Sequence, residues 1–517
     1  MEKFYLTTAI DYVNGAPHIG HAYEKILTDV IARHFSQRCD DVYFLTGTDE
    51  HGIKIQKTAA AKGISPQQMC DEHFAKFQQA WKVLEVNYSQ IIRTTDDNHK
   101  KIVQQIFKKL YEQGDIYKHS YQGLYCSGCE SFLNEKDLIG GKCPVHNVEP
   151  ELVSEENYFF KLTKYKDAII KHIKENPDFI VPAFRANEVL NQLENIEDIS
   201  VSRSKENVSW GIDVLDDSTQ IIYVWIDALS NYITALGYDV EKPCDTFKKY
   251  WPADVQVIGK DILKFHAIYW PAILLALDLE LPKHLFVHGF ININQEKMSK
   301  SLGNVISPVE IMKNWELQTP DALRYYLATA APFGKDGNFS DEDFKEKVNA
   351  DLANNMGNLL NRTLSMLVKY FEGGVNVLWN SDKCPIKPLE TVEKVKKLFD
   401  NFEIQEAANE IISLVDLTNK YVAENAPWSL AKEEKWDECG QVLTNVLEIM
   451  CVVCVLIYPF CPNIAQDMAN QLKFDLKTKL DDLNLNNIKQ GKLIEKEDIK
   501  PVFLRLDSEF ATNKGKM

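Results

Sequence analysis

The segment NGAPHIGHAYEKILTDVIARHF, residues 14–35, begins with turn-forming residues and continues as an amphipathic run. Its apolar side chains recur every three or four positions, which is the spacing of one face of a helix. The run before it, residues 3–10, is short, apolar and rich in β-forming residues, as expected of a buried strand. We therefore predict a strand–turn–helix unit, with His18 and His21 at the point where the helix begins.

Similar units follow along the chain. Short apolar runs alternate with helical patterns, and this order predicts an α/β fold with a doubly wound parallel sheet of the Rossmann type. Short β-like pieces interrupt the alternation, and a long C-terminal region with few glycines has the period of a helical bundle. The predicted boundaries are 1–115 and 221–340 for the two halves of the α/β domain, 116–220 for an insertion, 341–490 for the all-α bundle, and 491–517 for a tail that packs back on the body.

The composition is that of a globular protein, with 517 residues, 45% of them hydrophobic, and a net charge of −17. This charge argues against a surface that binds nucleic acid everywhere, but it allows a local basic track. The first ten residues lack the pattern of a signal peptide, and the apolar run 446–460 is too short to span a bilayer. Most of the 11 cysteines are isolated, so we expect a reduced, cytoplasmic protein with no membrane partner.

Two histidines three residues apart share one face of a helical turn. At the carboxyl edge of a parallel sheet, a helix N-terminus also presents N–H groups that bind phosphate. We interpret His18 and His21 as phosphate ligands, more strongly so when protonated, with Gly20 allowing a nucleotide to approach the backbone. Two alternatives remain at this point: surface histidines beside a turn, and a zinc pair that has no third ligand nearby.

A polar loop, NINQEKMSKSLGN at residues 292–304, follows an apolar strand in the second α/β half. Lys297 and Lys300 lie in it among small polar residues, and such clusters are often only solvated turns. Two strand-end loops can, however, close over one crevice. We therefore interpret these lysines as groups that neutralise a triphosphate when its charge shifts in a transition state.

The interrupted region holds four candidate metal ligands in two pairs. Two residues separate Cys126 from Cys129 and Cys143 from His146, and thirteen residues lie between the pairs. Thiolates and an imidazole at this spacing suit tetrahedral Zn²⁺, and four ligands leave no open coordination position. We predict one structural zinc ion; the alternative is four reduced side chains of no shared purpose.

The motifs PHIGH and KMSKS, in this order, resemble the signatures of class I aminoacyl-tRNA synthetases. The segments TTAIDYVNGAPHIGHAYE, LTGTDEHGIKIQKTA, YVWIDALSNYI, GKDILKFHAIYWPAIL and FVHGFININQEKMSKSLGN are similar to the methionyl-tRNA synthetase family. The resemblance implies a ligase that converts L-methionine and Mg·ATP to methionyl-adenylate and pyrophosphate, and then charges tRNA(Met). It also implies that the zinc ligands belong to the single-knuckle subgroup of this family.

The resemblance also assigns individual site residues. The residues assigned to ATP are His18, Gly20, His21, Gly259, Asp261, Lys297, Met298 and Lys300. The two histidines and the two lysines among them are the catalytic residues. Those for methionine are Ile10, Tyr12, Asp49, Trp225, Ala228, Leu229, Tyr232, Ile262 and His266. Asp49 is expected to pair with the α-ammonium group, and Tyr12 and His266 to offer polar contacts to the sulfur. Leu229 departs from the family, since some relatives have proline there.

In the predicted bundle, Asn358 and Arg362 share a helix face, and Trp428 lies at a helix boundary. A ring can stack on an unpaired base while amide and guanidinium groups bind its edges. The resemblance implies that these residues contact the CAU anticodon; the alternative is helix capping and core packing. The chain stops near the point where longer relatives begin an OB-type module that often dimerises them, so we expect a monomer.

The sequence disfavours three functions other than that of a methionine–tRNA ligase. A synthetase for cysteine is disfavoured because the zinc pattern lies outside an apolar pocket. A non-catalytic tRNA-binding paralogue is disfavoured because both histidines and both lysines are intact. A small-molecule adenylyltransferase with the same two motifs would lack the helical bundle.

Overall fold

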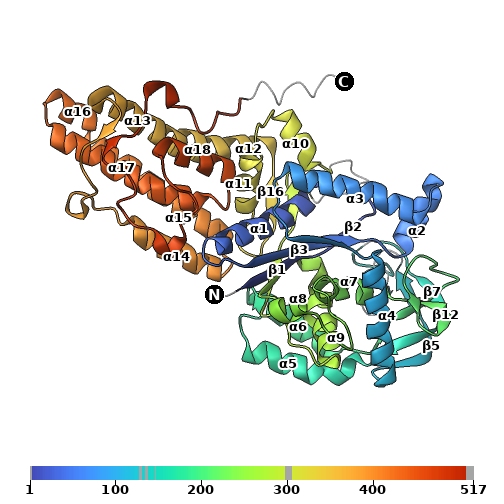
Figure 1. Ribbon diagram of the computed structural model, residues 1–517. Coiled ribbons are helices and arrows are strands. Elements are labelled where there is room, and N and C mark those ends of the chain that lie inside the picture. The colour runs from blue at the N-terminus through green and yellow to red at the C-terminus, as the bar shows by residue number, and fades with distance from the viewer. Residues whose placement is uncertain (1–2, 127–130, 134–137, 146, 297–304, 508–517) are drawn as a thin grey trace.

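A computed structural model of the chain describes residues 3–126, 131–133, 138–145, 147–296 and 305–507. Its central element is a seven-stranded sheet in which all pairings are parallel (Figure 1). The strand order is β2–β3–β1–β13–β14–β8, with β4 beside β3. The bounds are β1 Phe4–Thr8, β2 Asp11–Tyr12, β3 Val42–Asp49, β4 Gln90–Arg93, β8 Ile180–Val181, β13 Val255–Gly259 and β14 His284–His288.

The direction of the strand order changes between β1 and β13. On one side β1 leads through α1 (Ile19–Ser36) to β3, and on the other side β13 leads through α9 (Trp270–Ala276) to β14. Doubly wound sheets bind their ligands at such a switch point, outside the carboxyl ends of the strands. The predicted fold class is confirmed, and the loops after β1 and β13 lie at the place where a ligand is expected.

Helices cover both faces of the sheet (Figure 1). The predicted helices after the first two strands are present, and Ser65 caps α3 with its hydroxyl, which accepts a hydrogen bond from the N–H of Gln68. The remaining helices of the α/β region are α2 Ile53–Lys62, α3 Pro66–Val83, α4 Asp97–Glu112, α5 Lys166–Glu175, α6 Phe184–Glu194, α7 Val224–Thr234, α8 Asp245–Tyr250, α10 Pro308–Asn314 and α11 Asp321–Thr329.

The interrupted region forms small antiparallel sheets. One has the order β6–β5–β7–β9 and another the order β10–β12–β11. Within the predicted insertion, residues 116–220, β8 joins the main sheet beside β14. A strand of two residues has no period that the sequence could reveal. The bounds are β5 Ile116–Cys126, β6 Ser131–Leu133, β7 Glu151–Phe160, β9 Ile199–Ser200, β10 Ser202–Ser204, β11 Asp213–Val214 and β12 Asp217–Ile222.

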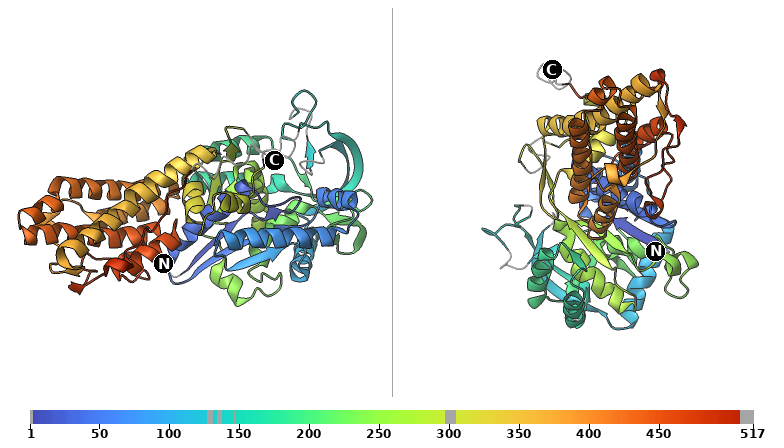
Figure 2. Two further views of the ribbon diagram at one scale, coloured as in Figure 1. Left: turned by 90° about the horizontal axis from the view of Figure 1, so that it is seen from above. Right: turned by 90° about the vertical axis from the view of Figure 1, so that its left-hand side faces the viewer.

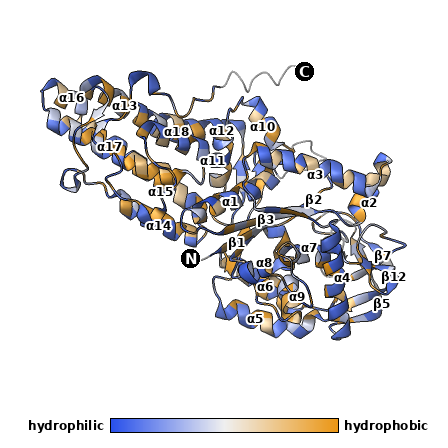
Figure 3. Cartoon of the chain, in the orientation of Figure 1, coloured by the Kyte–Doolittle hydropathy of each residue, from blue (hydrophilic) through white to orange (hydrophobic). Residues whose placement is uncertain are grey.

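The helical bundle extends from one side of the sheet domain (Figure 2). Its helices are α12 Asp341–Val348, α13 Asn358–Phe371, α14 Pro388–Asp400, α15 Ile404–Asn425, α16 Pro427–Lys432, α17 Trp436–Ile457 and α18 Pro462–Leu472, with a π-helical segment, η5 Asn349–Gly357, before α13. Within the described ranges, α17 alone has the length and apolar composition that could cross a membrane, and its apolar window is wholly buried. Figure 3 shows hydrophobic residues along α15 and α17, which form the interior of the bundle.

The C-terminal segment lies against the bundle. The buried carboxylate of Glu448 in α17 accepts hydrogen bonds from the backbone N–H groups of Asn487 (2.9 Å) and Ile488 (2.8 Å). The side chain of Asn349 forms two bonds of 2.8 Å with the backbone of Leu506. In the same segment, β18 (Gly491–Lys492) pairs with β17 (Gly374–Val375). A separate two-stranded sheet is formed by β15 (Ile291–Ile293) and β16 (Gly337–Phe339).

Candidate active site

The two histidines cap α1. Nδ1 of His18 accepts a hydrogen bond from the N–H of Gly20 (3.1 Å), and the N–H of His18 donates to Nδ1 of His21 (3.1 Å). A neutral imidazole that accepts through Nδ1 carries its proton on Nε2, which is then a donor. Protonation of Nδ1 would remove these caps. The pair is therefore suited to donate to phosphate oxygens in its neutral form, and the expectation that protonation strengthens the site does not fit this geometry.

The segment after the predicted lysine loop lies against the same helix end. The N–H of Ile19, the first residue of α1, donates to the carbonyl of Ile306 (2.9 Å). Lys297, Met298 and Lys300 themselves lie outside the described residues. The contact at Ile306 means that the chain emerges from this loop beside the histidine turn.

Across the switch point, β13 ends at Gly259 and a short 3₁₀ turn carries Asp261. A Cβ atom at position 259 would lie 2.7 Å from Oδ1 of Asp261. Only glycine therefore lets this carboxylate lie against the strand end. The exposed carboxylate lies just after the carboxyl end of β13, at the edge of the sheet where doubly wound folds bind ligands.

The predicted ammonium ligand meets two other pocket residues at the edge of the sheet. Tyr12 and Asp49 are register partners in β2 and β3. Gly47, within β3, allows Ile10 to approach, because a Cβ atom there would lie 2.8 Å from Cγ2 of Ile10 and 2.5 Å from the carbonyl oxygen of Ile92. One charged and two largely apolar side chains thus come together, as an amino-acid pocket requires.

Aromatic side chains of α7 and of a π-helical segment, η4 (Phe265–Tyr269), pack against one another and form the aromatic side of the predicted pocket. The Tyr232 hydroxyl lies 2.7 Å from Nε2 of His266, and Nδ1 of His266 lies 3.0 Å from the carbonyl of Ile262. Since a carbonyl only accepts, Nδ1 carries the proton and Nε2 accepts from Tyr232. Both ring nitrogens of His266 are therefore engaged within the protein in this arrangement, which leaves the tyrosine oxygen as the polar group next to the pocket.

Sequence reasoning missed one ring of this side. Phe265 stacks on Trp225 with ring centroids 3.6 Å apart and planes 5° from parallel. Its only signal was its position next to His266. Ala228 and Leu229, also predicted for the pocket, are buried on the same helix as Trp225.

Burial lowers the pKa of His266 from 6.5 to about 4, against a raising contribution from its bond to Ile262. We expect the ring to stay neutral, protonated on Nδ1, throughout the physiological range. Histidine ¹⁵N shifts should show that tautomer and no titration above about pH 5, with the His266→Gln variant identifying the signal. A midpoint near 6.5 would contradict this. Because the folded pKa lies below the unfolded one, acidification from pH 6.5 toward 4 is expected to remove stability.

A buried ionic cluster lies beneath the histidine turn. Lys25 is fully buried and donates to Asp11 (3.0 Å) and Glu24 (2.9 Å), and Glu24 also bonds His288 (3.1 Å). Burial raises the pKa of Asp11 to about 7, although Lys25 opposes this. Glu24 and Lys25 in α1 thus connect β2, through Asp11, with the carboxyl end of β14, through His288.

The predicted zinc region is described in part. Cys126 and Cys143 are both buried, although the surrounding turn exposes apolar residues such as Ile139 and Val145. The turn 139–142 has Gly140 and Gly141 at its central positions, both with positive φ, which is the conformation that a tight hairpin turn requires. Cys129 and His146 lie outside the described residues. The burial of Cys126 and Cys143 is compatible with soft metal ligands, but the part of the chain that the structure describes contains no group of three or more potential ligands.

The three predicted anticodon residues are exposed at one end of the bundle. Asn358 and Arg362 lie on the first turns of α13, directly after η5, and Trp428 is the second residue of α16 with 39% of its surface exposed. Figure 1 places α13 and α16 at the same end of the molecule. The Trp428 side chain is therefore partly open to solvent and not enclosed in the core.

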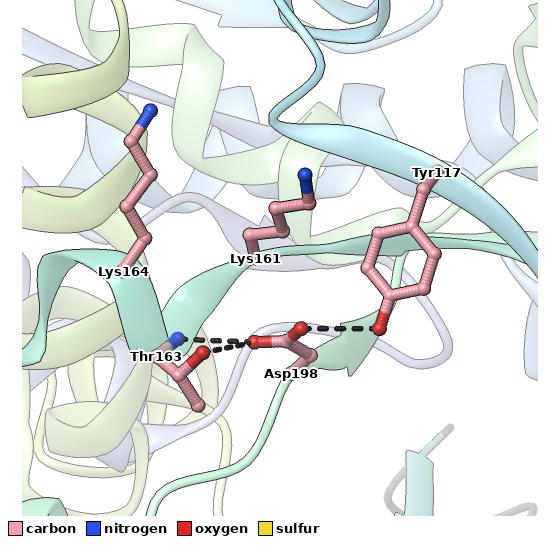
Figure 4. Close-up of a pocket in the computed structure, with 5 residues that line it drawn as sticks. All are labelled: Tyr117, Lys161, Thr163, Lys164 and Asp198. Carbon is pink, nitrogen blue, oxygen red and sulfur yellow. Dashed lines mark hydrogen bonds between the residues drawn. The ribbon is translucent and has the colours of Figure 1, made fainter.

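An open hollow of about 550 Å³ on the insertion is a different kind of site (Figure 4). Asp198 lies in it and accepts hydrogen bonds from the Tyr117 hydroxyl (3.0 Å) and from the hydroxyl of Thr163 (2.7 Å). Two lysines, Lys161 and Lys164, complete its lining. None of the residues predicted for methionine or ATP lines it, and its polar, open form differs from that of an amino-acid pocket.

The switch point carries a histidine-capped helix on one side and a carboxylate turn on the other, and a helical bundle follows the sheet domain. This arrangement is that of a class I aminoacyl-tRNA synthetase. The family described as tRNA synthetases class I (M) matches residues 4–149 and 135–364, and the anticodon binding domain of methionyl tRNA ligase matches residues 383–509. The chain belongs to the methionyl-tRNA synthetase family of ATP-dependent aminoacyl-tRNA ligases.

Individual relatives agree with this assignment. Methionine–tRNA ligase of Clostridium perfringens is 47% identical over 98% of this chain and 79% of its own length, and that of Listeria innocua is 44% identical over 98% and 78%. Mycobacterium tuberculosis methionyl-tRNA synthetase in complex with methionyl-adenylate has a TM-score of 0.91 at 36% identity, over 98% of this chain and 100% of that chain. Its free form has a TM-score of 0.84.

Proposed function

We propose that the chain activates L-methionine with Mg·ATP and then transfers the methionyl group to the 3′-terminal adenosine of tRNA(Met). This proposal is supported mainly by two groups of residues near the switch point, one suited to a nucleotide and one to an amino acid. The histidine turn and the Gly259–Asp261 turn suit a nucleotide. Asp49, together with the aromatic side formed by α7 and η4, suits an amino acid with an apolar side chain.

In the first step an oxygen of the methionine carboxylate attacks the α-phosphorus of ATP. The bond between the α-phosphorus and the bridging oxygen breaks, and pyrophosphate leaves with that oxygen. No protein nucleophile is needed, so the chain acts by positioning and by stabilising charge. We assign phosphate contacts to Nε2 of His18 and His21, the ribose to Asp261, the ammonium group to Asp49, and the developing pyrophosphate to Lys297 and Lys300.

Mg²⁺ enters with ATP and supplies charge neutralisation at the phosphates. Zinc is assigned a structural role, held by Cys126, Cys129, Cys143 and His146. In the second step the adenosine hydroxyl of tRNA attacks the carbonyl carbon of methionyl-adenylate and AMP leaves. The partner RNA is recognised at its CAU anticodon by Asn358, Arg362 and Trp428, and the reaction takes place in the cytoplasm.

Methionine-dependent exchange of labelled pyrophosphate into ATP tests the activation step. We expect exchange with methionine and none with cysteine, leucine or valine. Exchange with another amino acid would retain the class and overturn the pocket. If folded, zinc-loaded protein gave no exchange with any of them, the non-catalytic tRNA-binding alternative would replace this proposal.

Replacing Cys126 by serine is expected to lower the zinc content of the purified protein from about one ion per chain toward zero, because a tetrahedral site loses a thiolate. Elemental analysis measures this directly. The matched control is Cys244→Ser, since Cys244 is exposed and lies outside the predicted site. A zinc-free wild-type protein with full exchange activity would exclude the metal assignment.

Replacing Trp428 by alanine is expected to lower kcat/KM for tRNA by about 10- to 100-fold, the worth of one base stacked on a ring. Pyrophosphate exchange should not change, because the anticodon is not involved in adenylate formation. Trp436→Ala is the matched control, since its ring is 46% exposed but packs against Phe371. Equal losses in the two assays would argue that Trp428 has only a structural role.

A further inference from the structure

A buried polar network joins the two ends of the predicted methionine pocket. Oδ2 of Asp227, in α7, lies 2.7 Å from Nδ1 of His51, and Oδ1 lies 2.7 Å from Nε2 of His99 in α4. The other nitrogen of His99 lies 2.7 Å from the hydroxyl of Thr234, at the end of α7. None of these four side chains is more than 4% exposed.

Each member of the network is placed next to a pocket residue. His51 follows Asp49 by two positions in the loop after β3. Asp227 stands between Trp225 and Ala228 on α7. His99 holds α7 at two points seven residues apart and so fixes that helix along its length. One carboxylate therefore connects the loop that carries the ammonium ligand to the helix that carries the apolar and aromatic pocket residues.

Burial alone makes a lone carboxylate costly, so the two imidazole donors are needed to hold it. The histidines keep the pKa of Asp227 below its ordinary value although burial raises it. A fully hydrogen-bonded buried network permits one arrangement, whereas apolar packing alone would let α7 shift along its neighbours. A binding site tolerates a misplacement of only about 0.5 Å.

We propose that Asp227 is a positioning residue that sets the distance between Asp49 and the α7 side of the methionine pocket, through His51 and His99. The role rests on the proposed function. It predicts a defect in methionine recognition in particular, because the bonds of the network join the loop after β3, α4 and α7, whereas the two turns assigned to the nucleotide follow β1 and β13.

The test is Asp227→Asn, which keeps the volume but turns an amide N–H toward one of the histidine donors. We expect the KM for methionine in pyrophosphate exchange to rise at least about tenfold, within the range of coupled buried pairs, while the KM for ATP changes less than about twofold. Discrimination against norleucine, which lacks the sulfur, should also fall. Ser230→Ala is the control, because Ser230 is buried on the same helix and bonds only the carbonyl of Ile226.

A second pair of variants keeps the test decisive if Asp227→Asn does not fold. His99→Gln retains a donor toward Asp227 and should keep a near wild-type KM for methionine, whereas His99→Leu should reproduce the defect. Equal changes in the two KM values, or an unchanged KM in folded Asp227→Asn or His99→Leu, would overturn the proposal. Absence of methionine-dependent exchange in the wild-type protein would instead overturn the proposed function.

Discussion

Replacing Arg324 by methionine is expected to lower the free energy of unfolding by about 3–5 kcal/mol, the cost of breaking a buried ion pair from one side. Arg324 is fully buried in α11 and donates to Oδ2 of Asp29 in α1 at 2.6 Å. It also donates to the carbonyls of Pro459 (3.0 Å) and Phe460 (3.3 Å) in the bundle, and of Leu84 (3.2 Å) at the end of α3. One guanidinium group thus joins the signature helix to the helical bundle.

The expected loss comes mainly from Asp29, which stays buried when Arg324 is removed. Burial raises the pKa of this carboxyl, but Arg324 and Arg33 together hold it below its ordinary value. Because the folded pKa lies below the unfolded one, the stabilisation is present at neutral pH and is lost on acidification. The double variant Arg324→Met with Asp29→Leu should recover much of the loss, since no unpaired charge remains buried.

Arg38→Met is the matched control. Arg38 lies two residues after α1 and also reaches the bundle, where it pairs with Asp400 at 2.5 Å, but that carboxylate side chain is 48% exposed. Solvated pairs of this kind contribute at most about 1 kcal/mol. Thermal and urea unfolding of the wild type and the three variants measure the differences in the free energy of unfolding. Equal destabilisation by Arg324→Met and Arg38→Met would show that burial of the pair does not determine its contribution.

The burial of charged residues in α1 could not be predicted from the sequence. Its apolar positions were predicted from their period and are buried as expected. An amphipathic helix usually turns its polar face to solvent, yet Lys25 and Asp29 are fully buried. Periodicity describes one face of a helix against one partner. The helix here lies between the sheet and the helices that follow the α/β domain, and a single sequence does not reveal this second partner.

The same distinction separates the predicted from the unpredicted site residues. The histidine turn and the α7 face depend on spacings of three and seven residues, which local geometry fixes. The network of Asp227 joins residues 128 and 176 positions apart. Contacts between residues so far apart in the chain depend on the order of the strands in the sheet. A single sequence does not reveal that order, since one of the strands, β8, is only two residues long. The tautomers of the capping histidines likewise follow from hydrogen bonds that no motif specifies.

Replacing Asp49 by asparagine is expected to raise the KM for methionine about 100-fold or more, with little change in the KM for ATP. An ammonium group that enters a partly desolvated pocket loses its water, and without a carboxylate it stays uncompensated, which costs about 2–5 kcal/mol. Asparagine has nearly the same volume, so the register of β2 and β3 should persist. Pyrophosphate exchange at varied methionine concentration measures the effect.

A methionine analogue without the amino group makes this test specific to the charge. In the wild-type protein, 4-(methylsulfanyl)butanoate should inhibit far more weakly than methionine binds, because it does not satisfy Asp49. In the Asp49→Asn variant the difference between the two ligands should nearly vanish. Asp71→Asn serves as the control, since that carboxylate is 52% exposed and pairs with Arg93 outside the pocket. If the variant still preferred the ammonium-bearing ligand as strongly as the wild type, the charge partner would have to be another residue of the crevice.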